Sequence, residues 1–116
     1  MSDCLFCKII DKQIKADIVY EDERAMAFTD IKPTAPTHVL VIPRVHITSL
    51  NDVQAEHEAD VGHLFRVAAQ IAEQKGIAQS GYRTVFNCGP DAGQSVFHIH
   101  LHVVGGKPLG WPPFPR

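Results

Sequence analysis

The chain has 116 residues, of which 45% are apolar and 21% charged, and its formal net charge is −2. This size and composition are typical of one globular domain with its own hydrophobic core. No cluster of Lys and Arg appears, which argues against a nucleic-acid duplex as partner, and no apolar run approaches the length of a membrane span. We therefore expect a single domain over 1–116, with 105–116 as its C-terminal tail.

Two features of the sequence bear on the compartment in which the chain works. Positions 1–4 carry none of the basic residues that open a secretory signal peptide. The three cysteines are an odd number, which argues against a disulfide framework and fits a reducing environment. We therefore expect a cytoplasmic protein.

The predicted elements follow an α+β order. In chain order they are a short helix at 4–10, strands at 18–21, 25–28 and 38–42, a long helix, and strands at 82–87 and around 98–102. Pro33 and Pro36 keep the passage before the third strand extended. Asn51 or Asp52 can cap the long helix, and Gly76 stands where a glycine commonly ends one. Such an order favours a mostly antiparallel sheet with the helices on one face.

Apolar residues recur at helical spacing in the long helix, which predicts a stripe that packs on the sheet. The stripe comprises Val61, Leu64, Phe65, Ala68, Ile71 and Ala72. His57 and His63 fall in the same helix, where we expect solvated or partly buried histidines with no part in the chemistry.

Three alternating histidines, His98, His100 and His102, are the most informative feature of the sequence. A strand places residues i, i+2 and i+4 on one face, so the three imidazoles would share a face while Ile99 and Leu101 fill the other. Imidazoles with near-neutral pKa values can take up protons, attack an electrophile or bind a metal. One histidine in a strand is usually structural, but three in strict alternation favour function.

The segment just before the triad, Gly89-Pro90-Asp91-Ala92-Gly93-Gln94-Ser95, is rich in glycine. Such a loop is flexible enough to bring backbone N–H groups against phosphate oxygens. Hairpins also need glycine, but the position of this loop directly before the triad favours a phosphate site.

Cys4 and Cys7 have the C-x-x-C spacing of metal ligands, although no second C-x-x-C follows. His46, just after the central strand, and His98 are the candidates to complete a Cys₂His₂ set. The alternative is an apolar role for both cysteines in the short helix. Cys88 matches no ligand position and is expected to be a small buried residue.

The chain resembles the histidine-triad (HIT) family, whose signature is His-x-His-x-His with apolar x. The segments that carry the resemblance are Phe6-Cys7-Lys8-Ile9-Ile10, Ala27-Phe28-Thr29-Asp30-Ile31, Ala35-Pro36-Thr37-His38-Val39-Leu40-Val41-Ile42-Pro43 and Gly93-Gln94-Ser95-Val96. Gly105-Gly106 and Trp111-Pro112-Pro113 look like its Hint branch, the purine nucleoside phosphoramidases. The resemblance implies the HIT-like fold, in which a homodimer joins two five-stranded sheets into ten strands. It also implies one structural zinc at Cys4, Cys7, His46 and His98, since many bacterial members carry zinc at these positions.

The resemblance assigns the middle histidine, His100, as the nucleophile, with Nδ1–H held by a backbone carbonyl so that Nε2 presents its lone pair. His98 and His102 complete the triad, and His102 would donate to the α-phosphate. Ser95 would donate to a phosphoryl oxygen or to the departing amine. Gly93, Gln94 and Val96 would also contact the nucleotide.

Nucleoside recognition is implied for the N-terminal half, where Asp30 aligns with the family acid that pairs with the ribose hydroxyls. Phe28, Ile31 and Ile42 would line the purine slot, and Asn87 would lie on the phosphate or ribose side. Trp111 would either shape the leaving-group pocket of the partner subunit or anchor the tail.

The expected activity is hydrolysis of the P–N bond of purine nucleoside 5′-phosphoramidates through a nucleotidyl-histidine, which releases AMP or GMP and an amine. No cofactor beyond the structural zinc is needed. Three alternatives remain. They are a dinucleoside polyphosphate hydrolase, which Gly105-Gly106 and Trp-Pro-Pro argue against, a catalytic zinc on the three histidines, and a nucleotide-binding dimer with little turnover.

Overall fold

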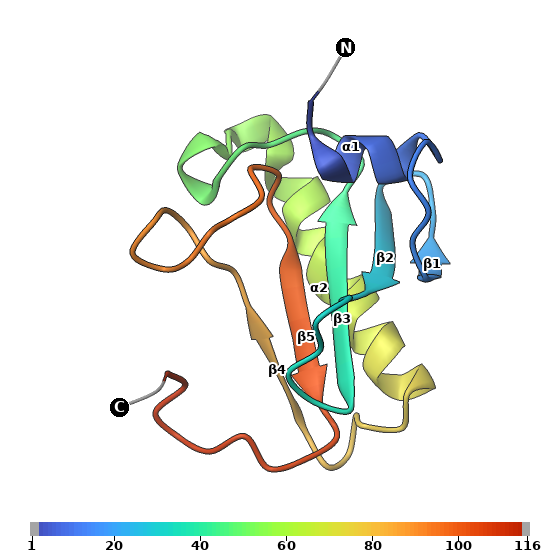
Figure 1. Cartoon of the computed structure of the whole chain (residues 1–116), viewed down its shortest axis with the longest axis vertical. Helices are drawn as coiled ribbons and strands as arrows, with labels where there is room; N and C mark the ends of the chain where they lie inside the picture. The colour runs from blue at the N-terminus through green and yellow to red at the C-terminus, as the bar shows by residue number, and fades with distance from the viewer. Residues whose placement is uncertain (1–2, 115–116) are drawn as a thin grey trace.

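The computed structural model describes residues 3–114, so the last two positions of the expected tail, 115–116, lie outside the described residues, as do 1–2. Five strands form one antiparallel sheet in the order β1-β2-β3-β5-β4 (Figure 1). The elements are α1 (Leu5–Ile10), β1 (Ile18–Glu21), β2 (Ala25–Thr29), β3 (Thr37–Pro43), two 3₁₀ turns (Leu50–Asp52 and Ala55–His57), α2 (Glu58–Gln74), β4 (Tyr82–Val85) and β5 (Leu101–Gly105). The expected α+β sheet is confirmed. Within 3–114, no helix has the length and apolarity that crossing a bilayer requires.

The two helices cover opposite faces of the sheet, so the prediction that they share one face is wrong. Ala27 and Val41 belong to the core beneath α2, whereas Phe28 and Leu40, one position away in the same strands, pack with Phe6 of α1. Because β2 and β3 carry apolar side chains on both faces, each face needs a cover to remove them from water. The short helix α1 supplies the second cover (Figure 1).

The long helix begins later than expected. The Ser49 hydroxyl accepts from the N–H of Asn51 at 3.2 Å and caps a 3₁₀ turn, and α2 starts only at Glu58. Asn51 and Asp52 therefore do not cap α2. Its end is as expected, because Gly76 follows the last turn with φ 73°, a conformation that glycine adopts without strain.

The buried stripe of α2 differs from the expected one at a single turn. Phe65 is 46% exposed, and Val67 is fully buried in the core in its place. The ring of Phe65 instead meets Phe86, just after β4, edge to face at 5.9 Å between centroids.

Only His102 of the triad lies in a regular strand, because β5 begins at Leu101. His98 and His100 precede it in extended chain, where the N–H of Ile99 donates to the carbonyl oxygen of Ile47 at 2.8 Å. Proline lacks an N–H, and β3 ends at Pro43, so the ladder with β3 cannot continue along 98–100. The alternation survives nevertheless, since Ile99, Leu101 and Val103 are all buried in the core beneath α2. β4 likewise ends two residues early, at Val85.

Candidate functional site

A cavity of about 550 Å³, the triad cavity, lies beside α1 and is lined by His100 and His102 of the triad. Its wall is mostly apolar and includes Leu5, Phe6, Ile9, Phe28, Ile31, Leu40 and Val96. Its polar groups include Asp30, Ser95, His100 and His102. A concave apolar wall with a few placed polar groups is typical of a small-molecule site.

His100 is held in one tautomer. Its Nδ1 lies 2.8 Å from the carbonyl oxygen of His98, and a carbonyl only accepts, so Nδ1 carries the hydrogen. Nε2 is then the nitrogen with the free lone pair. Burial lowers the pKa of His100 below its ordinary value, which keeps this imidazole neutral at pH 7. A neutral imidazole with a fixed lone pair in a cavity wall can act as a nucleophile.

His102 is held in the opposite tautomer through a fourth histidine. The backbone N–H of Thr34 donates to Nδ1 of His38 at 3.1 Å, so the hydrogen of a neutral His38 sits on Nε2. That Nε2 lies 2.9 Å from Nδ1 of His102, which accepts from it. The hydrogen of His102 is therefore on its own Nε2, and this atom is buried with no hydrogen-bond partner among the described residues. The rings of His100 and His102 lie 5.0 Å apart between centroids. The unpaired buried N–H of His102 is therefore a donor for a ligand oxygen beside His100.

Asp30 sits at the end of β2 beside His38. Its Oδ2 lies 3.3 Å from His38 Nε2, while Oδ1 accepts from the N–H of Lys32 at 2.8 Å. The carboxylate is thus fixed by backbone and lies next to the histidine that orients His102. His38 was missing from the sequence-based site, although its period-two spacing from Leu40 and Ile42 places it on the α1 face.

The other two histidines of the triad are also uncharged at neutral pH. Burial lowers the pKa of His102 to about 4, and burial likewise lowers the pKa of His98 to about 4. The three triad histidines therefore offer their nitrogens as lone pairs and N–H donors at neutral pH.

Gln94 holds the glycine-rich loop in shape. Its Oε1 accepts from the N–H of Gly89 at 3.0 Å, and its Nε2 donates to the carbonyl oxygens of Thr48 at 2.8 Å and Val96 at 3.2 Å. Gln94 is buried, so these bonds already satisfy its amide. Of the four nucleotide-contact residues expected at 93–96, Ser95 and Val96 line the cavity.

The remaining predicted residues divide into two groups. Phe28 and Ile31 line the cavity, and Ile31 is 93% exposed at its rim. Ile42 is fully buried in the core beneath α1 and does not line it, so its expected place in the purine slot is wrong. Asn87 and Trp111 are not among the cavity residues of this chain; Trp111 is 83% exposed and lies 6.0 Å from the guanidinium of Arg83.

Cys4, Cys7, His46 and His98 bring four ligand atoms together, all within 4.8 Å of one another. The Sγ–Nδ1 separations are 3.4 Å for Cys4–His98, 3.5 Å for Cys7–His46 and 3.6 Å for Cys7–His98, and the two Nδ1 atoms are 3.2 Å apart. A tetrahedral zinc with ordinary bond lengths needs edges of about 3.6 Å for S–N and about 3.3 Å for N–N. The side chains therefore fit a zinc ion.

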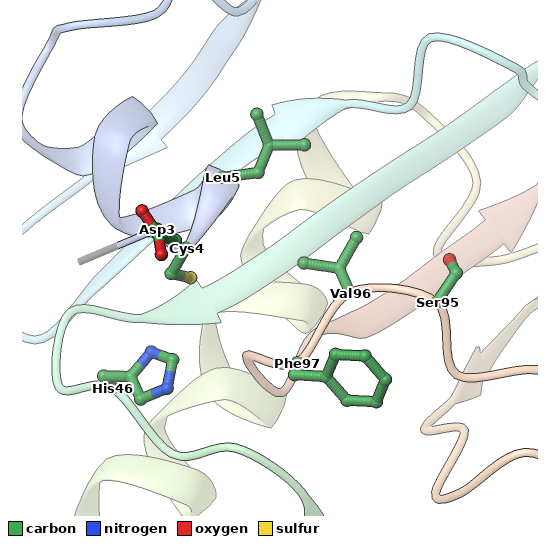
Figure 2. Close-up of a pocket in the computed structure, with 7 residues that line it drawn as sticks. All are labelled: Asp3, Cys4, Leu5, His46, Ser95, Val96 and Phe97. Carbon is green, nitrogen blue, oxygen red and sulfur yellow. The ribbon is translucent and has the colours of Figure 1, made fainter.

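The outer contacts of the cluster favour the same assignment. Nε2 of His98 lies 2.8 Å from the carbonyl oxygen of Pro43, so it carries the hydrogen and Nδ1 faces the sulfurs as a lone pair. Cys4 caps α1 and His46 follows β3, so the cluster joins the N-terminus, the sheet and the triad segment; Figure 2 shows Cys4 and His46 on one side of a neighbouring pocket. Cys88 lies outside this cluster and is half-buried.

Comparisons with known proteins agree with this geometry. A family model described as HIT domain matches residues 11–109. The chain is 54% identical to the purine nucleoside phosphoramidase of Escherichia coli (strain K12), over 91% of this chain and 89% of that protein. It is 47% identical to a 14 kDa zinc-binding protein of Zea mays, over 97% of this chain and 88% of that protein. The crystal structure of a HIT family hydrolase from Legionella pneumophila covers 97% of this chain and 100% of its own, with a TM-score of 0.94 and 45% identity.

Proposed function

We propose that this chain, which belongs to the HIT family and is a hydrolase, cleaves the P–N bond of purine nucleoside 5′-phosphoramidates. The observation that carries the proposal is the pair of opposite tautomers in one cavity. His100 offers a lone pair on Nε2, and His102 offers an unpaired N–H. The phosphoramidase of E. coli, at 54% identity, supports the choice of substrate.

In the first half-reaction, Nε2 of His100 attacks the α-phosphorus, and the P–N bond to the amine breaks. The His100 ring becomes cationic as the new N–P bond forms, and the His98 carbonyl oxygen, 2.8 Å from Nδ1, stabilises that charge. The N–H of His102 binds a phosphoryl oxygen, which satisfies its buried Nε2. Ser95 donates to the departing nitrogen, which gains a proton and leaves as the amine.

In the second half-reaction, water attacks the same phosphorus and the N–P bond to His100 breaks. The products are AMP or GMP and the regenerated neutral imidazole. Over both steps one water is consumed: its hydroxyl ends on phosphorus, and its remaining proton returns to Ser95 in place of the one that Ser95 gave to the amine. Covalent catalysis of this kind divides one difficult displacement into two easier ones.

Nucleoside binding is assigned to the half of the cavity near the end of β2. Asp30 is proposed to accept from the ribose hydroxyls, and Phe28 and Ile31 are proposed to face the purine. Support comes from their position in the same cavity as His100. Adenine and guanine both fit this proposal, because its contacts are to the ribose and to the flat face of the base.

A zinc at Cys4, Cys7, His46 and His98 is proposed to be structural. When bound, it supplies a cross-link between the N-terminus and the sheet, and it leaves His100 and His102 free for the chemistry. The fit of the four ligand atoms supports this role, as does the zinc-binding relative from Zea mays. Thiolate ligands must stay reduced, which accords with a cytoplasmic location. About one zinc per chain is expected in protein purified without chelator.

A homodimer is also proposed, joined through the β4 edge. Within 3–114, β4 borders the sheet on that side, and Tyr82 on it and Phe65 on α2 are exposed aromatic residues. Unpaired strand edges and exposed apolar side chains are what a second copy would cover. Light scattering during gel filtration tests this directly, and a single mass near the 12.8 kDa of one chain would contradict it.

The activity itself is tested by single-turnover mixing with radiolabelled adenosine 5′-phosphoramidate. The native protein should release AMP rapidly and carry label transiently, and His100→Ala should do neither. His57→Ala, which removes a histidine of the second 3₁₀ turn, is the matched control and should behave as native. Turnover that survives in His100→Ala would remove His100 as nucleophile. Tight AMP binding with no turnover in any form would indicate a binding module.

A further inference from the structure

The chain has a second cavity, of about 530 Å³, whose lining residues are drawn in Figure 2. It is lined by Asp3, Cys4, Leu5, His46, Ser95, Val96 and Phe97. Three of these residues, Leu5, Ser95 and Val96, also line the triad cavity, so the two hollows meet at them. His100 and Asp30 line only the triad cavity. The second cavity therefore remains unassigned by the proposed nucleotide site.

The geometry of the displacement directs the leaving group towards this second cavity. In a displacement at phosphorus the nucleophile and the leaving group lie roughly in line, on opposite sides. The nucleophile His100 belongs to the triad cavity alone, whereas Ser95, the proposed donor to the departing nitrogen, borders both. If the leaving nitrogen lies at Ser95, the substituent on that nitrogen extends past Val96 into the second cavity, towards Phe97.

The lining of the second cavity selects a class of amine. Phe97 is 60% exposed and Leu5 is 44% exposed, so both present large apolar surfaces that their own chain does not cover. With Val96 they form an apolar wall (Figure 2). Asp3 adds a carboxylate, and no Lys or Arg is among the described residues of the lining. Such a wall favours an aryl or branched alkyl group and disfavours a carboxylate next to it.

We propose that the second cavity is an amine subsite, which holds the apolar substituent of the leaving amine, with Phe97 as its specificity-determining residue. This inference rests on the proposed phosphoramidase activity. It names the substrate class as nucleoside phosphoramidates of apolar amines that carry no negative charge. Phe97 contacts the substituent and takes no part in the bond changes at phosphorus.

The test compares kcat/KM for two substrates in the protein as purified. One is adenosine 5′-phosphoramidate, whose amide nitrogen is unsubstituted, and the other is its N-(2-phenylethyl) derivative. Phe97→Ala should lower the ratio of the substituted to the unsubstituted substrate about tenfold, the usual size of a lost apolar pocket contact. Phe97→Leu should lower it less. Phe114→Ala removes another exposed phenylalanine, outside both cavities, and should leave the ratio as in the native protein.

Charge gives a second readout. A phosphoramidate of phenylalanine carries a carboxylate that the 2-phenylethyl compound lacks. Asp3→Asn should raise kcat/KM for the carboxylate-bearing substrate about threefold relative to the other, the range expected for one exposed charge pair.

The outcomes separate the two proposals. An unchanged ratio in Phe97→Ala, or a ratio that falls only in Trp111→Ala, would overturn the amine subsite while the hydrolase activity stands. Failure of the native protein to hydrolyse even the unsubstituted phosphoramidate would overturn the proposed function, and the subsite with it.

Discussion

The state of each histidine in the site is set by one neighbouring atom. His100 faces a carbonyl, which can only accept, while His102 faces the Nε2–H of His38, which can only donate because Nδ1 of His38 accepts from Thr34. The same side chain therefore presents a lone pair at one position and a hydrogen at the other. His38 in turn depends on the backbone N–H of Thr34, so the donor at His102 is fixed by a chain of contacts that begins in the backbone.

Replacement of His38 by Ala is expected to lower kcat about 10-fold to 100-fold, the usual cost of losing a partner that orients an active-site histidine. Without His38, Nδ1 of His102 loses its donor, so the hydrogen of His102 divides between its two nitrogens. Nitrogen-15 NMR of the His102 ring should show the mixed tautomers. His38→Gln retains an N–H donor and should recover part of the activity; an unshifted His102 spectrum in His38→Ala would contradict the relay.

At the scale of elements, the helix α1 has two tasks. Cys4 and Cys7, at its start and in its first turn, belong to the four-residue cluster that fits zinc, while Phe6 and Ile9 form part of the cavity wall. The ring of Phe6 meets that of His100 edge to face at 5.1 Å between centroids. A six-residue helix is too short to be stable alone, so its position depends on packing and on the cluster.

Loss of the metal should therefore weaken nucleotide binding without touching the nucleophile. Cys7→Ser is expected to raise the Kd for AMP about tenfold, because α1 loosens and the wall formed by Phe6 and Ile9 becomes mobile. Hydrogen exchange of residues 5–10 should rise in parallel. Cys88→Ser, outside the cluster, is the matched control. Unaltered exchange in zinc-free Cys7→Ser would show that packing alone holds α1.

The turn between β1 and β2 is tied to α2 by one carboxylate. Oδ2 of Asp22 accepts from Tyr20 Oη and from His63 Nε2, both at 2.6 Å, and Oδ1 accepts from two backbone N–H groups. Although burial raises the pKa of Asp22, the hydrogen bonds from Tyr20 and His63 hold it well below its usual range. His63 thus has a structural partner, in keeping with its expected place outside the chemistry.

Asp22→Asn should lower the free energy of unfolding by about 2 kcal/mol, since an amide group turns its own N–H towards one of the donors and loses a charge-assisted bond. Urea denaturation measures this. Asp60→Asn removes a pair with Arg24 at 3.4 Å and one charge from the first turn of α2, and should cost about 1 kcal/mol or less. Equal effects of the two substitutions would argue against the special role of Asp22.

The elements that could be predicted from the sequence are those whose signal is local. Strand alternation and Gly76 are such signals, and the C-x-x-C spacing correctly grouped Cys4 with Cys7. The start of α2 differs from the prediction because Asn51 and Asp52 are favourable caps in sequence, whereas the chain forms two 3₁₀ turns there and α2 begins only at Glu58. The role of His38 and the sheet face that α1 covers could not be predicted for a related reason. Both depend on the order of the strands in the sheet, and the contact between His38 and His102 joins residues 64 positions apart.

At the scale of the whole molecule, the buried neutral histidines make stability depend on pH. His102 has a folded-state pKa of about 4, and His100 is shifted in the same direction, both through burial. In the unfolded chain these histidines titrate near 6.5. Between pH 6.5 and about 4 the unfolded state therefore binds more protons than the folded state, so stability falls as the pH falls through this window.

Urea unfolding of the chelated protein, followed from pH 7 to pH 4.5, should show this loss, and the chelator removes any contribution from metal release. His102→Gln retains a polar side chain but cannot titrate, so its unfolding free energy should fall less steeply over the same range. The Asp22 carboxylate has a lowered pKa and stays charged in the folded state throughout this range. The stability that it contributes is lost only at pH values below the usual pKa range of Asp. Parallel curves for the native protein and His102→Gln would mean that His102 takes up its proton at the same pH in the folded and unfolded states, which would contradict the pKa lowered by burial.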